Sequence, residues 1–376
     1  MWSNCLGLIS FLCTLAFANG LAHAADPTLN ELAGLPVTAM FFSSGAPGMV
    51  VGLVRGSESL VGGLGETAKG NGQEPTGQSV FRLGSISKVM AGELLATLTV
   101  EGKLRLSEPL QRFAPQGKTV PTLEGRAITL LDLATHSAGL PRDIGPAPEG
   151  QTFLTWPTEH ERWDYIGSTN LLWPPATIAA YSNVGYQLLG DAMAAAAGES
   201  YSALLQSHLA APLSMTDTTV RPSAEQCARL MIGTGQSGPG PCIDTSPSAA
   251  SAGVYSTGDD MVKWLRHLIT GADVNAPARL IARAAYRQRA EMPVVIGFDE
   301  AGSMNGLGLG WVIEAPHDQM PLIVQKSGGA EGFMSYLAFV PGKAVGIFFV
   351  MNRMDLVTFS ATAAAANSIL AMLSPR

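Results

Sequence analysis

The chain has 376 residues, of which 47% are hydrophobic and 14% are charged, and it contains 42 glycines and 24 prolines. This length and apolar content exclude a disordered tail and a disulfide-stapled miniprotein, and they predict one large domain or two interlocked ones. The 23 Lys and Arg against 30 Asp and Glu give a formal net charge of -7, which argues against a nucleic-acid partner.

Residues 1–24 have the pattern of a secretory signal peptide. Residues 1–25 carry no Asp, Glu, Lys or Arg, residues 6–18 are apolar, and Ala22-His23-Ala24 fits the small-x-small cleavage pattern. We therefore expect an exported protein. The missing Lys or Arg before the apolar stretch leaves an uncleaved anchor open as the alternative. No later run approaches the roughly 20 apolar residues of a spanning helix.

Strand patterns occur near both ends of the chain. Residues 49–55 and 60–64 are short apolar runs separated by a polar turn, as in a hairpin. Further apolar runs alternate with Gly, Pro and polar breaks at residues 309–314, 322–325, 333–339 and 345–351. The last segment, residues 358–373, is Ala-rich and predicted to be helical.

Between these ends the pattern is mostly helical. Residues 87–101, 186–197 and 259–270 are each followed by a glycine, which is typical of a helix C-terminus. We therefore predict an α/β (α+β) fold, in which an antiparallel sheet flanked by helices is built from both chain ends. The sheet region is expected at residues 26–110 and 290–376, with a mainly helical insertion at residues 111–289.

Two cysteines, Cys227 and Cys242, remain if the signal segment is removed. In an oxidising compartment they can form a disulfide that closes a Gly- and Pro-rich loop, and two separate buried thiols are the alternative. A loop of about 15 residues would stabilise the fold by about 3 kcal/mol. No Cys and His cluster has zinc-ligand spacing, so we predict neither a metal nor a cofactor.

Two short motifs in the helical part carry candidate catalytic groups. Ser85 and Lys88 stand three residues apart at a predicted helix start and share a face, so the lysine can take the proton of a serine nucleophile. Tyr181 and Asn183 precede the next helix, where a phenol can relay a proton and an amide can hold a substrate carbonyl. Taken alone, the first motif is better explained by a solvated helix start and the second by a polar helix cap.

A third motif stands near the C-terminus, at the end of a predicted strand. Lys326 and Ser327 offer a cation and a hydroxyl for a substrate carboxylate, and Gly328 and Gly329 let a substrate lie against the strand edge. By itself this motif is also explained by a hairpin entrance. The order Ser-x-x-Lys, Tyr-x-Asn and Lys-Ser-Gly makes the three a set.

Together these motifs resemble the serine penicillin-recognising enzymes, the superfamily of D-Ala-D-Ala peptidases and serine β-lactamases, and specifically its class C branch. The resemblance covers nearly the whole mature chain, and residues 130–141, 212–218 and 251–257 also agree with it. Within that branch the chain is most similar to the AmpH-type penicillin-binding proteins. The stretches behind this similarity are residues 44–49, 156–158, 161–163, 227–231 and 308–311, with the pair Cys227 and Cys242.

The resemblance implies the β-lactamase/DD-peptidase fold and a serine hydrolase of the bacterial periplasm. Its expected activity is that of a DD-carboxypeptidase and DD-endopeptidase on peptidoglycan stem peptides. Ser85 would form the acyl-enzyme and would also bind penicillins and other β-lactams covalently. The backbone N–H groups of Ser85 and Gly329 would form the oxyanion hole.

The same resemblance implies a role for each remaining motif residue. Lys88 and Tyr181 would share the proton transfers, and Asn183 would hold the substrate amide. Lys326 with Ser327 would face the terminal carboxylate of the peptide. The third motif reads Lys-Ser-Gly where Lys-Thr-Gly is commoner in class C, but the hydroxyl is kept.

Several alternatives stay open at this point. A class C-type β-lactamase would hydrolyse its acyl-enzyme quickly, a family-related esterase would act on simple esters, and a penicillin or muropeptide sensor would bind without turnover. Lys326 favours a substrate with a carboxylate, which counts against the esterase. His136 could suggest a Ser-His catalytic pair, but the sequence has no Gly-x-Ser-x-Gly elbow to accompany it, so we assign His136 a structural role. The sequence leaves open the carboxypeptidase-to-endopeptidase preference, the oligomeric state and any peripheral association with the inner membrane.

Overall fold

The computed structural model describes residues 28–236, 238–270, 276–298 and 304–374, and the expected signal segment lies outside them. An eight-stranded sheet has the order β2-β1-β15-β14-β13-β12-β11-β9, and all neighbouring strands are antiparallel. Its strands are β1 (Gly48–Arg55), β2 (Glu58–Gly65), β9 (Arg287–Gln288), β11 (Gly306–Leu307), β12 (Val312–Glu314), β13 (Ile323–Ala330), β14 (Phe333–Val340) and β15 (Val345–Met351). The predicted antiparallel sheet built from both chain ends is confirmed, because β1 from the start of the chain pairs with β15 from its end.

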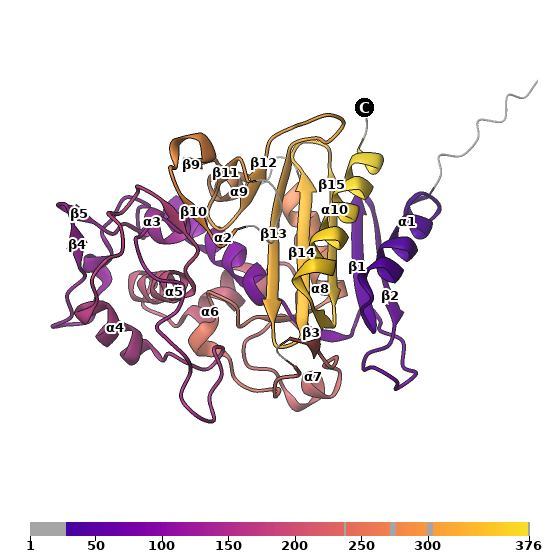
Figure 1. The fold of residues 1–376 in the computed structure, drawn as a ribbon, viewed down its shortest axis with the longest axis horizontal. Helices are drawn as coiled ribbons and strands as arrows, with labels where there is room; N and C mark the ends of the chain where they lie inside the picture. Colours follow the sequence, from indigo (N-terminus) through magenta and orange to yellow (C-terminus); the bar gives the residue numbers. More distant parts are fainter. Residues whose placement is uncertain (1–27, 237, 271–275, 299–303, 375–376) are drawn as a thin grey trace, which may run out of the picture.

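Helices cover the sheet on both faces and form a separate region beside it (Figure 1). The helices are α1 (Leu29–Ser44), α2 (Ser87–Val100), α3 (Leu130–Ala134), α4 (Glu159–Ser168), α5 (Asn183–Ala197), α6 (Tyr201–Leu205), α7 (Ala224–Ala228), α8 (Gly258–Ile269), α9 (Ala276–Arg283) and α10 (Leu356–Leu373). In Figure 1, α3 to α6 lie on the left and the sheet on the right. The division at residues 110/111 and 289/290 stays a prediction.

The core follows from the two-residue period of the strands. In β15, Ile347 and Phe349 belong to the apolar cluster shared with α1 and α10, whereas Phe348 and Val350 belong to the cluster shared with α2 and α8. The sheet is therefore buried on both faces. This explains why β14 and β15 read as continuous apolar runs.

The terminal helix α10 is the one helix of the described residues that is long and apolar enough to cross a membrane by length and composition. Its buried side chains, including Phe359 and Leu370, join the cluster between the sheet and α1. Packing in the core accounts for the apolar composition of this face of the helix.

One local expectation was wrong. Residues 309–314 do not form one strand, because Gly310 adopts φ +83 and the chain turns between β11 and β12. A Cβ at Gly310 would lie 2.9 Å from the Lys88 carbonyl oxygen, so this turn packs directly against the first turn of α2. In addition, α1 was not predicted from the sequence.

The site is positioned where the sheet meets the helical region. The short strand β3 (Val80–Arg82) pairs with β8 (Tyr255–Thr257) and leads through the 3-10 turn η1 (Gly84–Ile86) into α2. The neighbour of β13 on one side, β12, pairs only with residues 323–325. The following residues of β13 therefore present an edge that β12 leaves open, and this edge lies against η1.

Candidate active site

Ser85 and Lys88 lie one turn apart at the junction of η1 and α2. The Lys88 Nζ is 3.3 Å from the Ser85 Oγ, and the lysine side chain is buried. The Lys88 Nζ also donates to two carbonyl oxygens, Asn183 Oδ1 at 2.7 Å and the Ser251 backbone oxygen at 2.7 Å. A neutral amine has two hydrogens and one lone pair, so these contacts can use the hydrogens while the lone pair accepts the Ser85 proton.

Asn183 is the first residue of α5, and its amide has a fixed orientation. The Ser182 hydroxyl caps the helix by accepting from the Gly185 N–H at 3.0 Å. The Asn183 Oδ1 faces Lys88, while its Nδ2 donates to Asp143 Oδ1 at 2.9 Å. Because a carboxylate accepts only, this contact keeps the amide nitrogen turned away from Lys88.

Tyr181 is surrounded by positive charge. The Nζ of Lys88 is 4.8 Å and the Nζ of Lys326 is 5.1 Å from the centre of its ring. The Arg142 Cζ is 5.1 Å from the same centre. These cations stabilise negative charge on the phenol oxygen, which suits a group that accepts and returns a proton.

His136 forms a wall behind Tyr181. The two rings stack with their centres 4.3 Å apart, and His136 Nδ1 accepts the Ser182 N–H at 3.0 Å. Burial holds the pKa of His136 well below its usual 6.5, and the nearby cations lower it further. The imidazole is therefore neutral and serves to hold the Tyr181 ring and the entry to α5 in place.

The glycines of β13 bring its backbone into contact with the nucleophile turn. A Cβ on Gly328 would lie 2.1 Å from the Leu83 carbonyl oxygen. Gly84 has φ +55, and a Cβ there would lie 2.6 Å from the Gly329 nitrogen. Only glycine permits this approach. The backbones of Ser85 and Gly329, which the family resemblance implies as oxyanion donors, are thereby held together.

A cavity of about 180 Å³ opens at this junction. It is lined by six of the predicted site residues, namely Ser85, Tyr181, Lys326, Ser327, Gly328 and Gly329. Arg142 and Lys326 bring two cations to its wall, and among the described residues that line it there is no Asp or Glu, so this part of the wall suits a ligand with a carboxylate. A larger hollow of about 520 Å³, between Arg112, Trp163 and Asp191, contains none of the predicted site residues.

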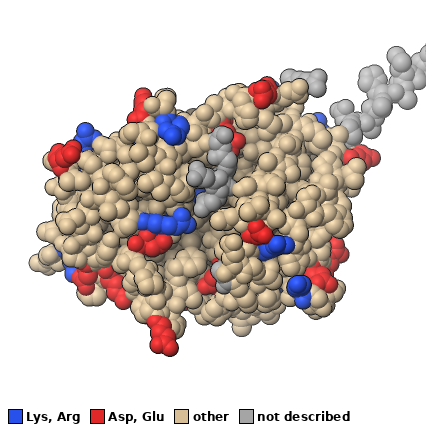
Figure 2. Space-filling view, viewed as in Figure 1, with Lys and Arg blue, Asp and Glu red and all other residues tan. Residues whose placement is uncertain are grey.

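The surface of this face carries no extended patch of one sign. Lys and Arg alternate with Asp and Glu in small groups over the part of the protein drawn in colour (Figure 2). Within the described ranges, no group of three His, Cys, Asp or Glu side chains is placed to hold a metal ion.

The sequence motifs missed three contributors to this site. Arg142 lies beside Tyr181, Asp143 holds the Asn183 amide, and the Ser251 carbonyl accepts from Lys88. Arg142 and Asp143 directly follow residues 130–141, and Ser251 begins residues 251–257. Both stretches had already suggested the family, so their position in the sequence was the available signal.

Comparisons with known proteins agree with this geometry. The family model described as Beta-lactamase matches residues 27–371. The D-alanyl-D-alanine-carboxypeptidase/endopeptidase AmpH of Escherichia coli K12 is 37% identical over 360 residues, covering 94% of this chain and 92% of that protein. A Beta-lactamase of the same organism is 27% identical over 368 residues, covering 91% and 94%. The crystal structure of a Beta-lactamase/D-alanine Carboxypeptidase from Yersinia pestis with citrate has a TM-score of 0.86 at 37% identity, covering 92% of this chain and 99% of that one.

Proposed function

Because the chain belongs to the beta-lactamase family, we propose that it is a serine DD-peptidase that cleaves the D-Ala-D-Ala ends and cross-links of peptidoglycan stem peptides. The observation that carries the proposal is the contact of Lys88 with both Ser85 and Asn183, because Ser85 itself lines a cavity that is also lined by Lys326. A nucleophile with its base and a cation for the substrate carboxylate are what this reaction needs.

Acylation begins at Ser85. Its Oγ attacks the carbonyl carbon of the penultimate D-Ala and its proton passes to the Lys88 Nζ, 3.3 Å away. The peptide C–N bond then breaks, and Tyr181, beside Lys88, delivers a proton to the leaving amine. The Ser85 and Gly329 N–H groups stabilise the oxyanion, and each such donor is worth about 3 kcal/mol in comparable sites. Water completes hydrolysis by the reverse proton path.

Substrate recognition uses the open edge of β13. The terminal carboxylate lies between Lys326 and the Ser327 hydroxyl, and the Asn183 amide holds the acyl side of the scissile bond. A penicillin carries its carboxylate in a comparable position and therefore acylates the same Ser85. We assign the chain to the class C-type branch and place it, after export, in the bacterial periplasm, where stem peptides are accessible.

A class C-type β-lactamase is the second candidate. It is favoured by the E. coli Beta-lactamase that is 27% identical over 91% of the chain, and by the two activities named for the Y. pestis structure. The two candidates share acylation at Ser85 and differ in how fast water removes a β-lactam from it. A displacement of the water by about 1 Å is enough to change that rate by two orders of magnitude.

A time course with fluorescent penicillin distinguishes these candidates. The purified mature protein and its Ser85→Ala variant are followed by intact mass, and D-Ala release from a muramyl pentapeptide is measured in parallel. We expect a persistent adduct on Ser85, D-Ala release, and neither in Ser85→Ala. Rapid loss of the adduct with drug hydrolysis would favour the β-lactamase, and labelling without peptide cleavage would favour a sensor. Labelling of Ser85→Ala at another residue would overturn the site.

A further inference from the structure

A buried ion pair joins the two segments that carry the proposed oxyanion donors. Arg82 ends β3, three residues before Ser85, and Glu331 begins the turn after β13, two residues after Gly329. The Arg82 Nη2 lies 2.9 Å from the Glu331 Oε2, and the two side chains are only 2% and 8% exposed. The pair therefore links the end of β3, which leads to Ser85, with the hairpin turn between β13 and β14.

The geometry around Glu331 is constrained. Its φ is 42, in the left-handed region that non-glycine residues seldom adopt. A buried charge is tolerated only where its partner is held in place, and loss of that partner leaves an uncompensated charge in the interior. The burial of the Glu331 carboxylate therefore depends on Arg82 remaining beside it.

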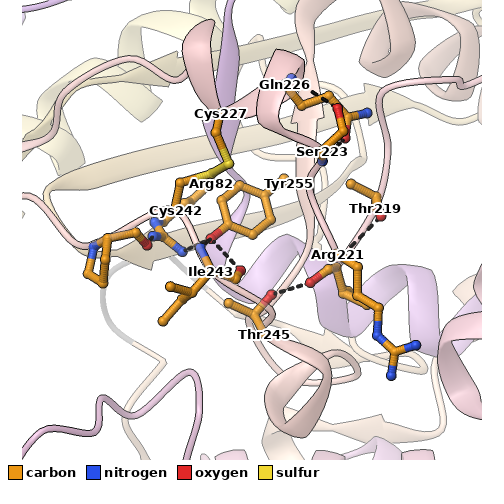
Figure 3. The surroundings of a disulfide bond; sticks show 12 residues. Arg82, Thr219, Arg221, Ser223, Gln226, Cys227, Cys242, Ile243, Thr245 and Tyr255 are labelled. Atoms are coloured by element: carbon orange, nitrogen blue, oxygen red, sulfur yellow. Dashed lines mark hydrogen bonds between the residues drawn. A yellow bond between two sulfur atoms is a disulfide. The ribbon is translucent and has the colours of Figure 1, made fainter.

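The loop closed by the disulfide between Cys227 and Cys242 holds Arg82 from the other side. Arg82 Nη2 donates to the carbonyl of Pro241, and its Nη1 donates to the Tyr255 hydroxyl at 2.7 Å. Figure 3 shows the guanidinium beside Tyr255 and Cys242, while Cys227 reaches the bond from α7. The guanidinium thus links the disulfide loop with β8 and the hairpin turn.

The same loop also contacts the hairpin turn directly. The Thr234 N–H donates to the Gly332 carbonyl at 3.2 Å. A Cβ on Gly240 would lie 1.4 Å from the Glu331 Oε2, so the loop backbone passes immediately beside the carboxylate. Gln236 of this loop lines the catalytic cavity. The loop therefore connects the disulfide to the substrate site through backbone contacts.

We propose that Arg82 and Glu331 are positioning residues for acyl transfer, and that the Cys227–Cys242 loop holds them so that the Ser85 and Gly329 N–H groups keep the spacing of an oxyanion hole. The proposal rests on the proposed DD-peptidase function. The pair acts through the backbone that it connects and does not contact the substrate. Displacing it should slow the chemical step and leave carboxylate binding at Lys326 unchanged.

Two variants displace the carboxylate by different means. Glu331→Gln removes the charge at constant size, and Gly240→Ala keeps the charge but pushes the carboxylate from its place. The matched control is Asp191→Asn, because Asp191 forms a similarly buried pair with Arg162 at 2.6 Å in the helical region. The double variant Cys227→Ser with Cys242→Ser tests the loop. Thermal unfolding is measured for each protein so that kinetics are compared only below its transition.

The readout is penicillin acylation of Ser85 as a function of drug concentration, which separates the maximal rate from the half-saturating concentration. For Glu331→Gln and Gly240→Ala we expect a maximal rate about 10-fold to 100-fold lower, with the half-saturating concentration changed by less than about twofold. The disulfide variant should show a smaller decrease of the same kind. Asp191→Asn should lose thermal stability but acylate at the unmodified rate.

The outcomes separate this inference from the proposed function. If the unmodified protein is not acylated at all, the proposed function fails. If it is acylated and both Glu331→Gln and Gly240→Ala match its maximal rate, the positioning role is refuted. An equal decrease in Asp191→Asn would also refute it, because the effect would then be general loosening of the fold. If Glu331→Gln does not fold, Gly240→Ala decides the question.

Discussion

The contact between Gly84 and Gly329 gives a sharp test of how the nucleophile turn is positioned. In the Gly84→Ala variant, the new Cβ would lie 2.6, 2.7 and 2.8 Å from the nitrogen, carbonyl carbon and oxygen of Gly329. Ordinary contacts begin at 3.4 Å, so η1 and β13 must separate by about 0.8 Å. All three atoms belong to backbone, which leaves no flexible side chain to move aside.

The expected cost has two parts. Alanine at a left-handed φ costs about 1–2 kcal/mol of stability at any site. A displacement approaching 1 Å at the oxyanion hole lowers the acylation rate about 100-fold, or about 2.7 kcal/mol in the barrier. Gly102→Ala provides the control, because Gly102 has φ +73 but nothing lies within 4 Å of its Cβ position. The Gly102→Ala variant should therefore lose stability without a change in its acylation rate.

The assay compares urea unfolding with the maximal rate of penicillin acylation for both variants. Gly102→Ala should lose about 1–2 kcal/mol of unfolding free energy and acylate normally. Gly84→Ala should lose at least as much stability and also acylate about 100-fold more slowly. Normal acylation by a folded Gly84→Ala protein would refute the reasoning, because the two backbones would then be free to separate without consequence for the chemistry.

Two further predictions concern groups around the nucleophile. In Asp143→Ala the Asn183 amide loses the acceptor that fixes its orientation, 2.9 Å from its Nδ2. Because the Asp143 side chain is 45% exposed and water can replace it, we expect acylation to be only about fivefold slower. An unchanged acylation rate would show that the Asn183 amide does not need this support. The second prediction concerns His136, whose imidazole stays neutral in the folded protein because burial lowers its pKa. In the unfolded chain the same imidazole takes up a proton below about pH 6.5. His136 therefore lowers the free energy of unfolding as the pH falls below about 6.5, by at most about 1.4 kcal/mol per pH unit. His136→Asn, which keeps an acceptor and tolerates the observed φ of 56, should lose this part of the slope in urea unfolding between pH 5 and 7.5, and identical slopes for both proteins would contradict the assignment.

Much of the fold could be predicted because burial leaves a periodic pattern. The runs at residues 333–339 and 345–351 match β14 and β15 closely, since both faces of those strands are covered. The helix α1 was missed because its apolar residues surround it and do not form a single stripe. Leu35 and Phe42 are 80% and 74% exposed, on the side away from its buried residues. A pattern without a polar face gives no helical period to detect.

The strand β13 shows where local sequence misleads. The strand was predicted to end at Gln325, before Gly328 and Gly329, yet β13 continues through both glycines to Ala330. Glycine weakens a strand in isolation. These two glycines are needed because the backbone of residues 83–86 lies against them. That requirement is tertiary, and it cannot be derived from the strand sequence alone.

The site likewise contains residues that could be predicted from the sequence and residues that could not. Ser85 and Lys88 could be paired from helical spacing, and the structure places them in contact. The third contact of Lys88 is with a backbone carbonyl, that of Ser251, and a main-chain acceptor has no residue-type signature. Asp143 lies 40 residues before Asn183 in the sequence and outside the three motifs. Sequence therefore identifies groups that are chemically distinctive, and misses those that act only by position.

This distinction bears on the choice between peptidase and β-lactamase. In the mechanism that we propose, acylation depends on Ser85, Lys88 and Lys326, and both activities would share these residues. Deacylation of a β-lactam depends on where a water can lie above the acyl carbonyl. The cavity is also lined by residues outside the three motifs, among them Gln236 and Met354. Met354 ends β16 (Arg353–Met354), which pairs with β7 (Thr234–Gly235), and Gln236 lies in the turn that follows β7. Substitutions in this segment can therefore change the fate of the acyl-enzyme while every motif residue stays the same.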